Sequence, residues 1–306
     1  MKLFDAHCHL QDPRILSKTP HLIATAIETG VLRFAVNGVS EKDWRLVKEL
    51  GERYPSVIPC FGLHPWFITE RSPNWFVTLK EYFEATPSAA VGEIGLDKGS
   101  HGKTIDFTEQ VEVFQKQLEL AKELNRPASV HCVRAFGYLL EIMKNTGPFP
   151  AGVILHSYLG SPDMVPEFTK LGAYFSFSGF LMSIKEQKAK QMLKAVSLDR
   201  ILLETDAPDA LPNKELDSLS LVAGDDFVTE RIHSEGENSA SSTDSLLATS
   251  DSGNQSSSKE TFNHPANIHL VLGYVASLLD TSKEELAERT YQNAVRLFSY
   301  EASNVL

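Results

Sequence analysis

Long apolar runs, cysteines and basic residues are all scarce in this chain of 306 residues. No run approaches the ~18–20 consecutive apolar residues of a membrane-spanning helix, so we expect no membrane span. The three cysteines, Cys8, Cys60 and Cys132, are odd in number and far apart, which argues against a disulfide framework and favours buried packing positions. The sequence shows no secretory leader, and we therefore expect a cytoplasmic or nuclear protein.

Positive charge is outnumbered by negative charge, with 29 Lys and Arg against 40 Asp and Glu and a formal net charge of −11. Such a balance disfavours broad electrostatic attraction to nucleic acid. Much of the excess is local, because residues 213–262 contain ten acidic and three basic residues, a net charge of −7. The rest of the chain is only mildly acidic, and bound divalent cations would offset that charge further.

Short apolar stretches alternate with amphipathic ones along most of the chain, as in a parallel sheet with crossover helices. The predicted strands are Lys2–Ala6, Leu32–Asn37, Val57–Gly62, Ala89–Glu93, Pro127–His131, Gly152–His156, Ala173–Ser178 and Arg200–Glu204. The predicted helices lie near residues 20–29, 40–53, 73–85, 107–125, 135–145, 162–171, 184–195, 266–280 and 283–298. This alternation predicts an α/β protein with the fold of a TIM-like (β/α)8 barrel.

One segment interrupts the alternation. Residues 234–258 contain ten serines, together with Gly, Asn and Asp and few large apolar side chains. Such a composition buries too little apolar surface to offset the entropy of ordering the chain. We predict that residues 215–262 form a largely disordered, Ser-rich acidic insertion after the eighth strand, within a single domain over residues 1–306. The sequence leaves open whether it is phosphorylated or tethers a partner.

Histidines and carboxylates recur where the predicted strands end. His7 and His9 lie two residues apart in an extended segment, so their side chains point the same way and can hold one metal ion together. Taken alone, the pair could equally be two half-buried polar strand residues. Catalytic groups of barrels cluster at the carboxyl ends of the strands, and six candidate ligands fall there: His7, His9, Glu93, His131, His156 and Asp206. Four imidazoles and two carboxylates fit two divalent ions that share one carboxylate.

The motifs around these residues resemble those of the TatD family of metal-dependent deoxyribonucleases, in the amidohydrolase superfamily. The matching segments are Phe4–His9, Gly62–Pro65, Gly92–Asp97, Val130–Arg134, His156–Gly160 and Glu204–Pro208. They lie within residues 1–212, and Pro265–Phe298 resembles the C-terminal helices of the family. The resemblance implies a barrel enzyme that hydrolyses phosphodiester bonds of DNA, as a 3′-to-5′ exonuclease acting on single strands or 3′ ends.

The resemblance also implies how the ligands are divided. One metal would be held by His7, His9, Glu93 and Asp206, and the other by Glu93, His131 and His156, with Glu93 as the bridge. Asp206 would in addition orient or deprotonate the attacking water. His64 would position the phosphate. Arg134 is a further candidate for the phosphate because its planar guanidinium suits that group, although an ordinary surface role is an open alternative.

Two questions stay open at the metal centre. Asp97 is either a hydrogen-bond partner for a ligating histidine or a turn residue. The metal is also ambiguous, since imidazole-rich sites favour Zn or other transition metals and carboxylate-rich sites suit Mg. The family implies activity with Mg, whereas four histidines lead us to expect Zn or Mn to bind at least as tightly. The predicted cofactors are therefore two divalent ions, either Mg, Mn or Zn.

Two stretches depart from the family pattern. The loop after Pro208 is normally short and here carries the long insertion, which ends at Asn263-His264-Pro265, where many members have an acidic residue before the proline. Lys98-Gly99 replaces the aromatic residues often found after the Gly-Leu-Asp segment. The rim that faces substrate should therefore differ from that of other members, and substrate preference is less fixed than the class of reaction.

Two other functions compete with DNA hydrolysis. The same metal frame serves carbonyl chemistry in amidohydrolases and esterases, such as a D-aminoacyl-tRNA deacylase. A carbamylated lysine often bridges the metals of such relatives, and Glu93 takes that position here, which favours the nuclease. The other rival is a non-catalytic protein that acts through the Ser-rich segment, and the complete ligand set argues against it. No separate nucleic-acid-binding motif is present, so DNA should contact the barrel rim; no protein partner is implied.

Overall fold

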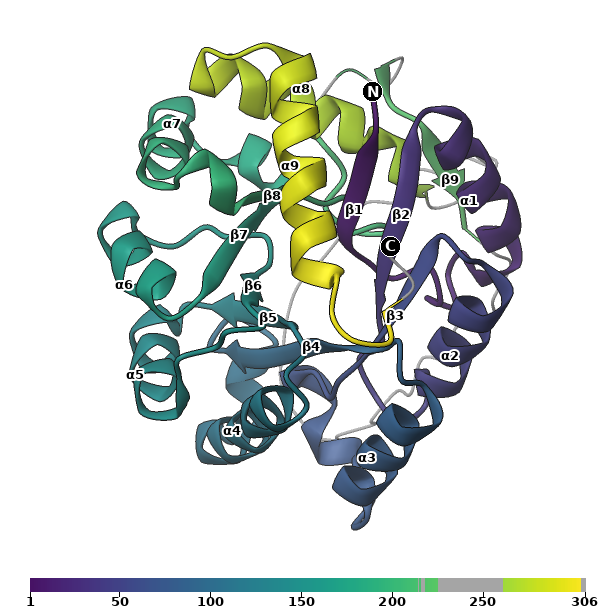
Figure 1. Ribbon diagram of the computed structural model, residues 1–306, viewed down its shortest axis with the longest axis vertical. Coiled ribbons are helices and arrows are strands. Elements are labelled where there is room, and N and C mark those ends of the chain that lie inside the picture. Colours follow the sequence, from purple (N-terminus) through teal and green to yellow (C-terminus); the bar gives the residue numbers. More distant parts are fainter. Residues whose placement is uncertain (214, 216–217, 225–260, 304–306) are drawn as a thin grey trace, which may run out of the picture.

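Eight parallel strands pair in sequence order, from β1 to β8, and curve into a barrel with helices outside (Figure 1). The computed structural model describes residues 1–213, 215, 218–224 and 261–303. The strands are β1 (Leu3–Cys8), β2 (Val31–Asn37), β3 (Val57–Phe61), β4 (Ala90–Asp97), β5 (Ala128–Val133), β6 (Val153–Leu155), β7 (Ala173–Phe177) and β8 (Ile201–Leu203). The predicted (β/α)8 architecture is confirmed.

The helices occupy the predicted intervals. They are α1 (Thr19–Glu28), α2 (Trp44–Arg53), α3 (Trp75–Ala85), α4 (Phe107–Glu123), α5 (Phe136–Thr146), α6 (Val165–Lys170), α7 (Glu186–Ala195), α8 (Ile268–Leu279) and α9 (Lys283–Phe298). Side-chain caps fix some starts: the Asp106 carboxylate accepts from the Glu109 N–H before α4, and the Ser282 hydroxyl accepts from the Glu285 N–H before α9. None of the helices in the described part of the chain is long and apolar enough to cross a membrane.

Two layers of apolar side chains hold the barrel together. One lies between the sheet and the surrounding helices and includes Leu3 and Val36. The other fills the barrel interior and includes Phe4, which stacks on Phe298 of α9 with ring centroids 5.1 Å apart. In Figure 1, α9 lies across the near end of the barrel, in front of the strands. Because Phe4 is near the start of β1, α9 closes the amino-terminal end and leaves the carboxyl ends of the strands for the site.

All three cysteines are free, as predicted. Cys8 and Cys60 are buried and Cys132 is half-buried. Cys8 packs in the layer between the sheet and the helices, so it points away from the side on which the histidines before and after it meet. Strand alternation therefore assigns these cysteines to packing rather than to chemistry.

The seam between β8 and β1 is closed by hydrogen bonds just beyond the end of β8. The Asp206 N–H donates to the His7 carbonyl at 2.9 Å. Below it, the buried Asp5 carboxylate accepts from the Thr205 N–H at 2.9 Å and from the Thr205 hydroxyl. Burial raises the pKa of Asp5 to about 8, although the Thr205 donors act in the opposite direction. The seam fixes two predicted metal ligands, His7 and Asp206, beside each other.

The predicted insertion, 215–262, falls mostly on residues outside those described, which omit 225–260. Its two ends form a short ribbon, in which β9 (Leu221–Ala223) pairs antiparallel with β10 (Thr261–Asn263). Asn267 fixes this ribbon, because its side chain both donates to the Ser220 carbonyl and accepts from the Ser220 N–H. The structure thus differs from the prediction at both ends of the segment, since strands of three residues give too little alternation to be recognised in a sequence.

Candidate metal centre

The six predicted ligands converge at the carboxyl end of the barrel. They come from β1 and the residue after it (His7, His9), from β4 (Glu93), from β5 (His131) and from positions just past β6 and β8 (His156, Asp206). Their ligating atoms form overlapping groups in which all atoms lie within 4.8 Å of one another: His7, His156 and Asp206; His7, His9 and Glu93; and His64, Glu93 and His131. Strand ends far apart in the sequence thus build one centre.

Glu93 lies between two sets of histidines and presents one carboxylate oxygen to each. Its Oε1 is 2.9 Å from Nε2 of His156 and 3.1 Å from Nδ1 of His131. Its Oε2 is 3.3 Å from Nε2 of His9 and 3.6 Å from Nε2 of His7. A carboxylate arranged in this way can ligate two cations at once, so the geometry suits Glu93 as a bridge.

The position of Glu93 corrects one predicted boundary. The sequence predicts that β4 ends at Glu93, but the strand continues to Asp97. Gly95 is needed inside the longer strand, because its φ is +149° and a Cβ there would lie 1.9 Å from the His131 carbonyl oxygen. Because residues two apart share a face of a strand, the longer β4 places both Glu93 and Asp97 at the centre.

Asp206 completes the group formed by His7 and His9. Its Oδ1 lies 3.4 Å from Nε2 of His9 and 3.7 Å from Nε2 of His7. The backbone of Asp206 is left-handed, with φ of 53°, a conformation that costs energy in a residue other than glycine and is common at functional sites. The hydrogen bond from its N–H to the His7 carbonyl holds this conformation in place.

The pKa values at the centre favour ionised carboxylates and a protonated histidine, whose proton a bound cation could replace. Burial raises the pKa of Glu93, but His64 and His156 lower it more, so that it lies well below its usual range. Burial lowers the pKa of His9, yet Asp206 and Glu93 raise it further, to about 9. The carboxylates are therefore ionised while His9 holds a proton in the metal-free protein. A divalent cation would replace such protons, as metal binding to histidine requires.

The outer nitrogen of each predicted histidine ligand faces an oxygen atom. Three of these contacts are hydrogen bonds, to the Asn37 carbonyl from His9 (2.8 Å), to the Ser129 hydroxyl from His7 (2.7 Å) and to Asp97 Oδ2 from His131 (3.2 Å). Glu204 Oε1 lies 3.5 Å from Nδ1 of His156, within ion-pair distance but without a hydrogen bond. A proton on the outer nitrogen leaves the inner nitrogen with a free lone pair directed at the centre. This is the tautomer that a metal-ligating histidine needs, and such outer partners orient the ring.

His64 has the opposite arrangement. Its Nδ1 accepts a hydrogen bond from the Trp66 N–H at 3.1 Å, so the proton of the neutral ring lies on Nε2. Burial lowers the pKa of His64 to about 4, which keeps the ring neutral. Nε2 faces Oε1 of Glu93 at 3.4 Å. His64 therefore directs an N–H donor into the centre, whereas the other four histidines direct nitrogens that could ligate a cation once deprotonated.

Asp97 resolves an alternative that the sequence leaves open. Its Oδ2 lies 3.2 Å from Nε2 of His131 and accepts a hydrogen bond from Nε1 of Trp66 at 2.6 Å. Burial raises the pKa of Asp97, but hydrogen bonds from His131, Gly99 and Trp66 lower it more, to about 2. Asp97 is thus an ionised partner of a histidine in the centre rather than only a turn residue.

Some residues of the centre could not be assigned a role from the sequence. Asn37, Ser129 and Glu204 meet the ligands only through the fold, although the Glu-Thr-Asp motif at 204–206 offered a signal for Glu204. Trp66 follows the His64-Pro65 motif directly and was recognisable only by that proximity. Arg134 is exposed after β5 with φ of 54°, so its side chain stands at the rim and its contact with phosphate stays a prediction.

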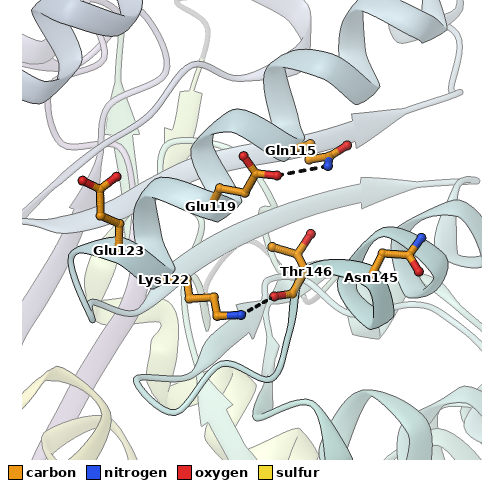
Figure 2. Close-up of a pocket in the computed structure, with 6 residues that line it drawn as sticks. All are labelled: Gln115, Glu119, Lys122, Glu123, Asn145 and Thr146. Atoms are coloured by element: carbon orange, nitrogen blue, oxygen red, sulfur yellow. Dashed lines mark hydrogen bonds between the residues drawn. The ribbon is translucent and has the colours of Figure 1, made fainter.

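A separate depression lies on the outer surface, near the C-terminal halves of α4 and α5 (Figure 2). It is lined by Gln115, Glu119, Lys122, Glu123, Asn145 and Thr146. Lys122 Nζ donates to the Thr146 carbonyl at 2.7 Å, which ties the two helices together. Barrel helices run antiparallel to the strands, so this depression lies toward the amino-terminal end, and it contains none of the candidate ligands.

The donor set fits divalent cations, because buried imidazole nitrogens and carboxylate oxygens are ligands that Zn, Mn and Mg accept. A barrel with such a centre at the carboxyl ends of its strands has the design of a metal-dependent hydrolase. The chain belongs to the TatD family: residues 4–299 match the family described as TatD related DNase.

Three relatives illustrate this membership. "Uncharacterized metal-dependent hydrolase YabD" of Bacillus subtilis is 27% identical over 296 residues, covering 97% of this chain and 98% of that protein. Human "Deoxyribonuclease TATDN3" is 27% identical over 307 residues, covering 97% and 94%. "3′-5′ ssDNA/RNA exonuclease TatD" of Pantoea vagans is 28% identical over 215 residues, covering 69% and 81%. The chain is accordingly a metal-dependent hydrolase of the TatD family.

A solved structure supports the fold independently. The crystal structure of YjjV, a TatD homologue from Escherichia coli, superposes with a TM-score of 0.75 at 23% sequence identity. The superposition covers 97% of this chain and 98% of the bacterial one. The whole barrel, including the closing helices α8 and α9, is therefore shared.

Proposed function

We propose that this protein removes nucleotides from the 3′ ends of DNA by hydrolysing phosphodiester bonds, with two divalent cations as cofactors. The observation that carries the proposal is the placement of Glu93, which offers one oxygen to each of two histidine groups. Relatives named as a deoxyribonuclease and as a 3′-5′ exonuclease support the choice of substrate. Bound cations would neutralise charge at phosphorus and activate water.

We infer the division of the ligands from the family resemblance and from the distances to the two oxygens of Glu93. One cation would be held by His7, His9, Asp206 and Oε2 of Glu93, and the other by His131, His156 and Oε1 of Glu93. Mg, Mn and Zn are all compatible with this mixture of imidazole and carboxylate. The groups behind His7, His9 and His131 would orient these rings toward a bound cation.

The remaining groups act on the substrate and the water. The Nε2–H of His64 would donate to a phosphate oxygen, and a neutral donor is well suited because it does not compete for the cations. Burial raises the pKa of Asp206, but His9, His156 and His7 lower it more, so its carboxylate is ionised and can orient the attacking water or accept its proton. Arg134, exposed at the rim, would contact another phosphate oxygen.

A metal-titrated assay tests this function. The metal-stripped protein is mixed with single-stranded DNA labelled at either end, and then with Mg, Mn or Zn. We expect a labelled mononucleotide from the 3′-labelled strand, only gradual shortening of the 5′-labelled strand, and no cleavage before metal is added. Glu93→Gln, prepared identically, controls for a contaminating nuclease. Rapid hydrolysis of a D-aminoacyl-tRNA without cleavage of DNA would contradict the proposal and favour the esterase alternative.

A further inference from the structure

Trp66 is an exposed aromatic residue that is fixed against the metal centre along one edge. Its side chain is 38% exposed. Its Nε1 donates to Asp97 Oδ2 at 2.6 Å, and its ring meets the His64 ring edge-on with centroids 5.0 Å apart. A large indole that is anchored but still open to solvent is an available surface for a flat ligand. The other tryptophans, Trp44 and Trp75, are buried at 0% and 6% exposure.

Further groups of complementary chemistry lie on the same side of the mouth. The exposed ring of His101 is 4.6 Å from the Trp66 ring, at an angle of 43°. Lys98 follows β4, and its Nζ is held 4.2 Å from the Phe107 ring centroid and 4.1 Å from that of Tyr138. Aromatic surfaces beside a cation are the combination with which proteins bind single-stranded nucleic acid, through base stacking and phosphate attraction.

Asp97 fixes the distance between this surface and the metal ligands. The same oxygen that accepts from Trp66 lies 3.2 Å from Nε2 of His131, and the other ring nitrogen of His131 is 3.1 Å from Glu93. The ring centroids of Trp66 and His131 are 6.1 Å apart. The indole is therefore held within one nucleotide of the place where a phosphate would be bound.

We propose that Trp66 stacks on the base of a nucleotide next to the scissile phosphate, so that the DNA strand enters over the ends of β3 and β4. The inference rests on the proposed DNA hydrolysis and adds to it a binding residue and a direction of approach. Stacking of this kind tolerates every base, since each has a π-face. Trp66 would thus bind a strand end without selecting its sequence.

Tryptophan fluorescence tests the contact without relying on cleavage. The metal-loaded protein is titrated with a thymidine decamer whose 3′ linkages are phosphorothioates, which slows hydrolysis. Because Trp44 and Trp75 are buried, quenching should report Trp66. We expect saturable quenching by this decamer and much less by a decamer whose last two nucleotides are abasic. The Trp66→Phe variant should lose the signal while remaining folded.

Kinetics with normal phosphodiester decamers provide the second readout. Trp66→Ala should raise KM about 10-fold, within the range found for loss of one base stack, with kcat changed by less than about threefold. It should leave KM for the abasic decamer unchanged, and Trp66→Phe should retain most of the affinity. Phe180→Ala is the matched control, because Phe180 is also exposed, at 41%, but follows β7 on another side of the barrel.

The outcomes separate this inference from the proposed function. The protein could cleave DNA while neither the quenching nor KM depends on the terminal bases. That result would overturn the proposed stacking but not the proposed nuclease function. Base-dependent quenching of Trp66 without cleavage under any metal would support the stacking and reject the nuclease. An equal rise in KM for Phe180→Ala would overturn the assignment of the strand to the side of β3 and β4.

Discussion

The Asp5 carboxylate accepts two hydrogen bonds from Thr205, one from the backbone N–H at 2.9 Å and one from the hydroxyl. This buried pair joins β1 to the residues just after β8, where the barrel closes. Candidate metal ligands lie close by on both segments: His7 is two positions after Asp5, and Asp206 directly follows Thr205. The stability of the seam and the placement of these two candidate ligands therefore depend on the same contact.

Replacing Thr205 by valine should destabilise the fold without a change of shape. The variant removes one hydrogen-bond donor to the buried Asp5 carboxyl group, and loss of such a hydrogen bond typically costs about 1–3 kcal/mol of unfolding free energy. Urea denaturation of the metal-free protein measures it. Thr104→Val is the control, since the Thr104 hydroxyl is exposed and its loss should cost less than about 0.5 kcal/mol. Equal stability of the two variants would show that the seam does not depend on the hydroxyl.

Glu93→Ala and His64→Ala should separate metal binding from substrate binding. Glu93→Ala removes the oxygen offered to each histidine group, so it should reduce bound metal and abolish turnover. His64→Ala should keep the metal content and slow turnover by roughly 10²–10³-fold, as for loss of one donor to a developing charge. Elemental analysis after gel filtration gives the stoichiometry. Loss of one ion from His64→Ala would show that His64 is a ligand and that its assigned tautomer is wrong.

Asp97→Asn should weaken metal binding although Asp97 is not among the predicted ligands. The amide carries no charge to hold the outer N–H of His131, and substitutions of such partners typically reduce metal affinity about 10- to 100-fold. A competitive titration against a chromogenic chelator measures the affinity. Affinity equal to that of the unaltered protein would mean that the contact between Asp97 and His131 does not support ligation.

Metal affinity should rise with pH. Since the pKa of His9 is raised to about 9, metal binding at pH 7.5 must release its proton. Apparent affinity should therefore increase as the pH rises from 7 to 9. In the metal-free protein, the raised pKa implies a stabilisation that is complete below about pH 6.5 and is lost as pH rises through about 9. Calorimetry in two buffers of different protonation enthalpy gives the number of protons released on metal binding. A metal affinity that does not depend on pH would exclude the release of a proton from His9.

The ends of the predicted insertion should matter more than its middle. Ala223 pairs with Thr261, so residues 224–260 can be replaced by a two-residue Asn-Gly hairpin turn that joins β9 to β10. We expect this variant to keep its melting temperature and metal content. Deletion of all of 215–262 should be less stable, because it removes the partners of Asn267. Equal melting temperatures for the two variants would show that the ribbon contributes no stability.

The sequence predicts the barrel well, and it predicts the strand-end residues that the fold brings together, because both follow from local patterns. Apolar strands alternate with helices, and His7, Glu93 and Asp206 occur at or near strand ends in recognisable motifs. The contacts of Asn37, Ser129 and Trp66 are different, since each depends on which strand lies next to which. The tautomer of His64 likewise depends on a turn, in which its Nδ1 accepts from a backbone N–H two residues later.

The boundary of β4 shows a further limit. The sequence predicts a strand that ends at Glu93, and Gly95 lies just beyond that end, where glycine in general weakens a strand. Here Gly95 is required by the neighbouring strand, whose His131 carbonyl leaves no room for a Cβ. The local preference of glycine predicts that the strand ends before residue 95, whereas the packing against β5 requires a glycine inside the strand. Only the folded structure shows that the packing decides.

Helix α9 covers the amino-terminal end of the barrel, where Phe298 stacks on Phe4. Apolar side chains fill the interior behind this helix, so the centre can be reached only from the carboxyl ends of the strands. A polymer that reaches the candidate ligands must present an end or a bend there, and it cannot pass through to the other side. Under the proposed DNA hydrolysis, the product of each cleavage would leave by the route along which the next residue arrives. Release of the product and advance of the strand would then alternate at this one end of the barrel.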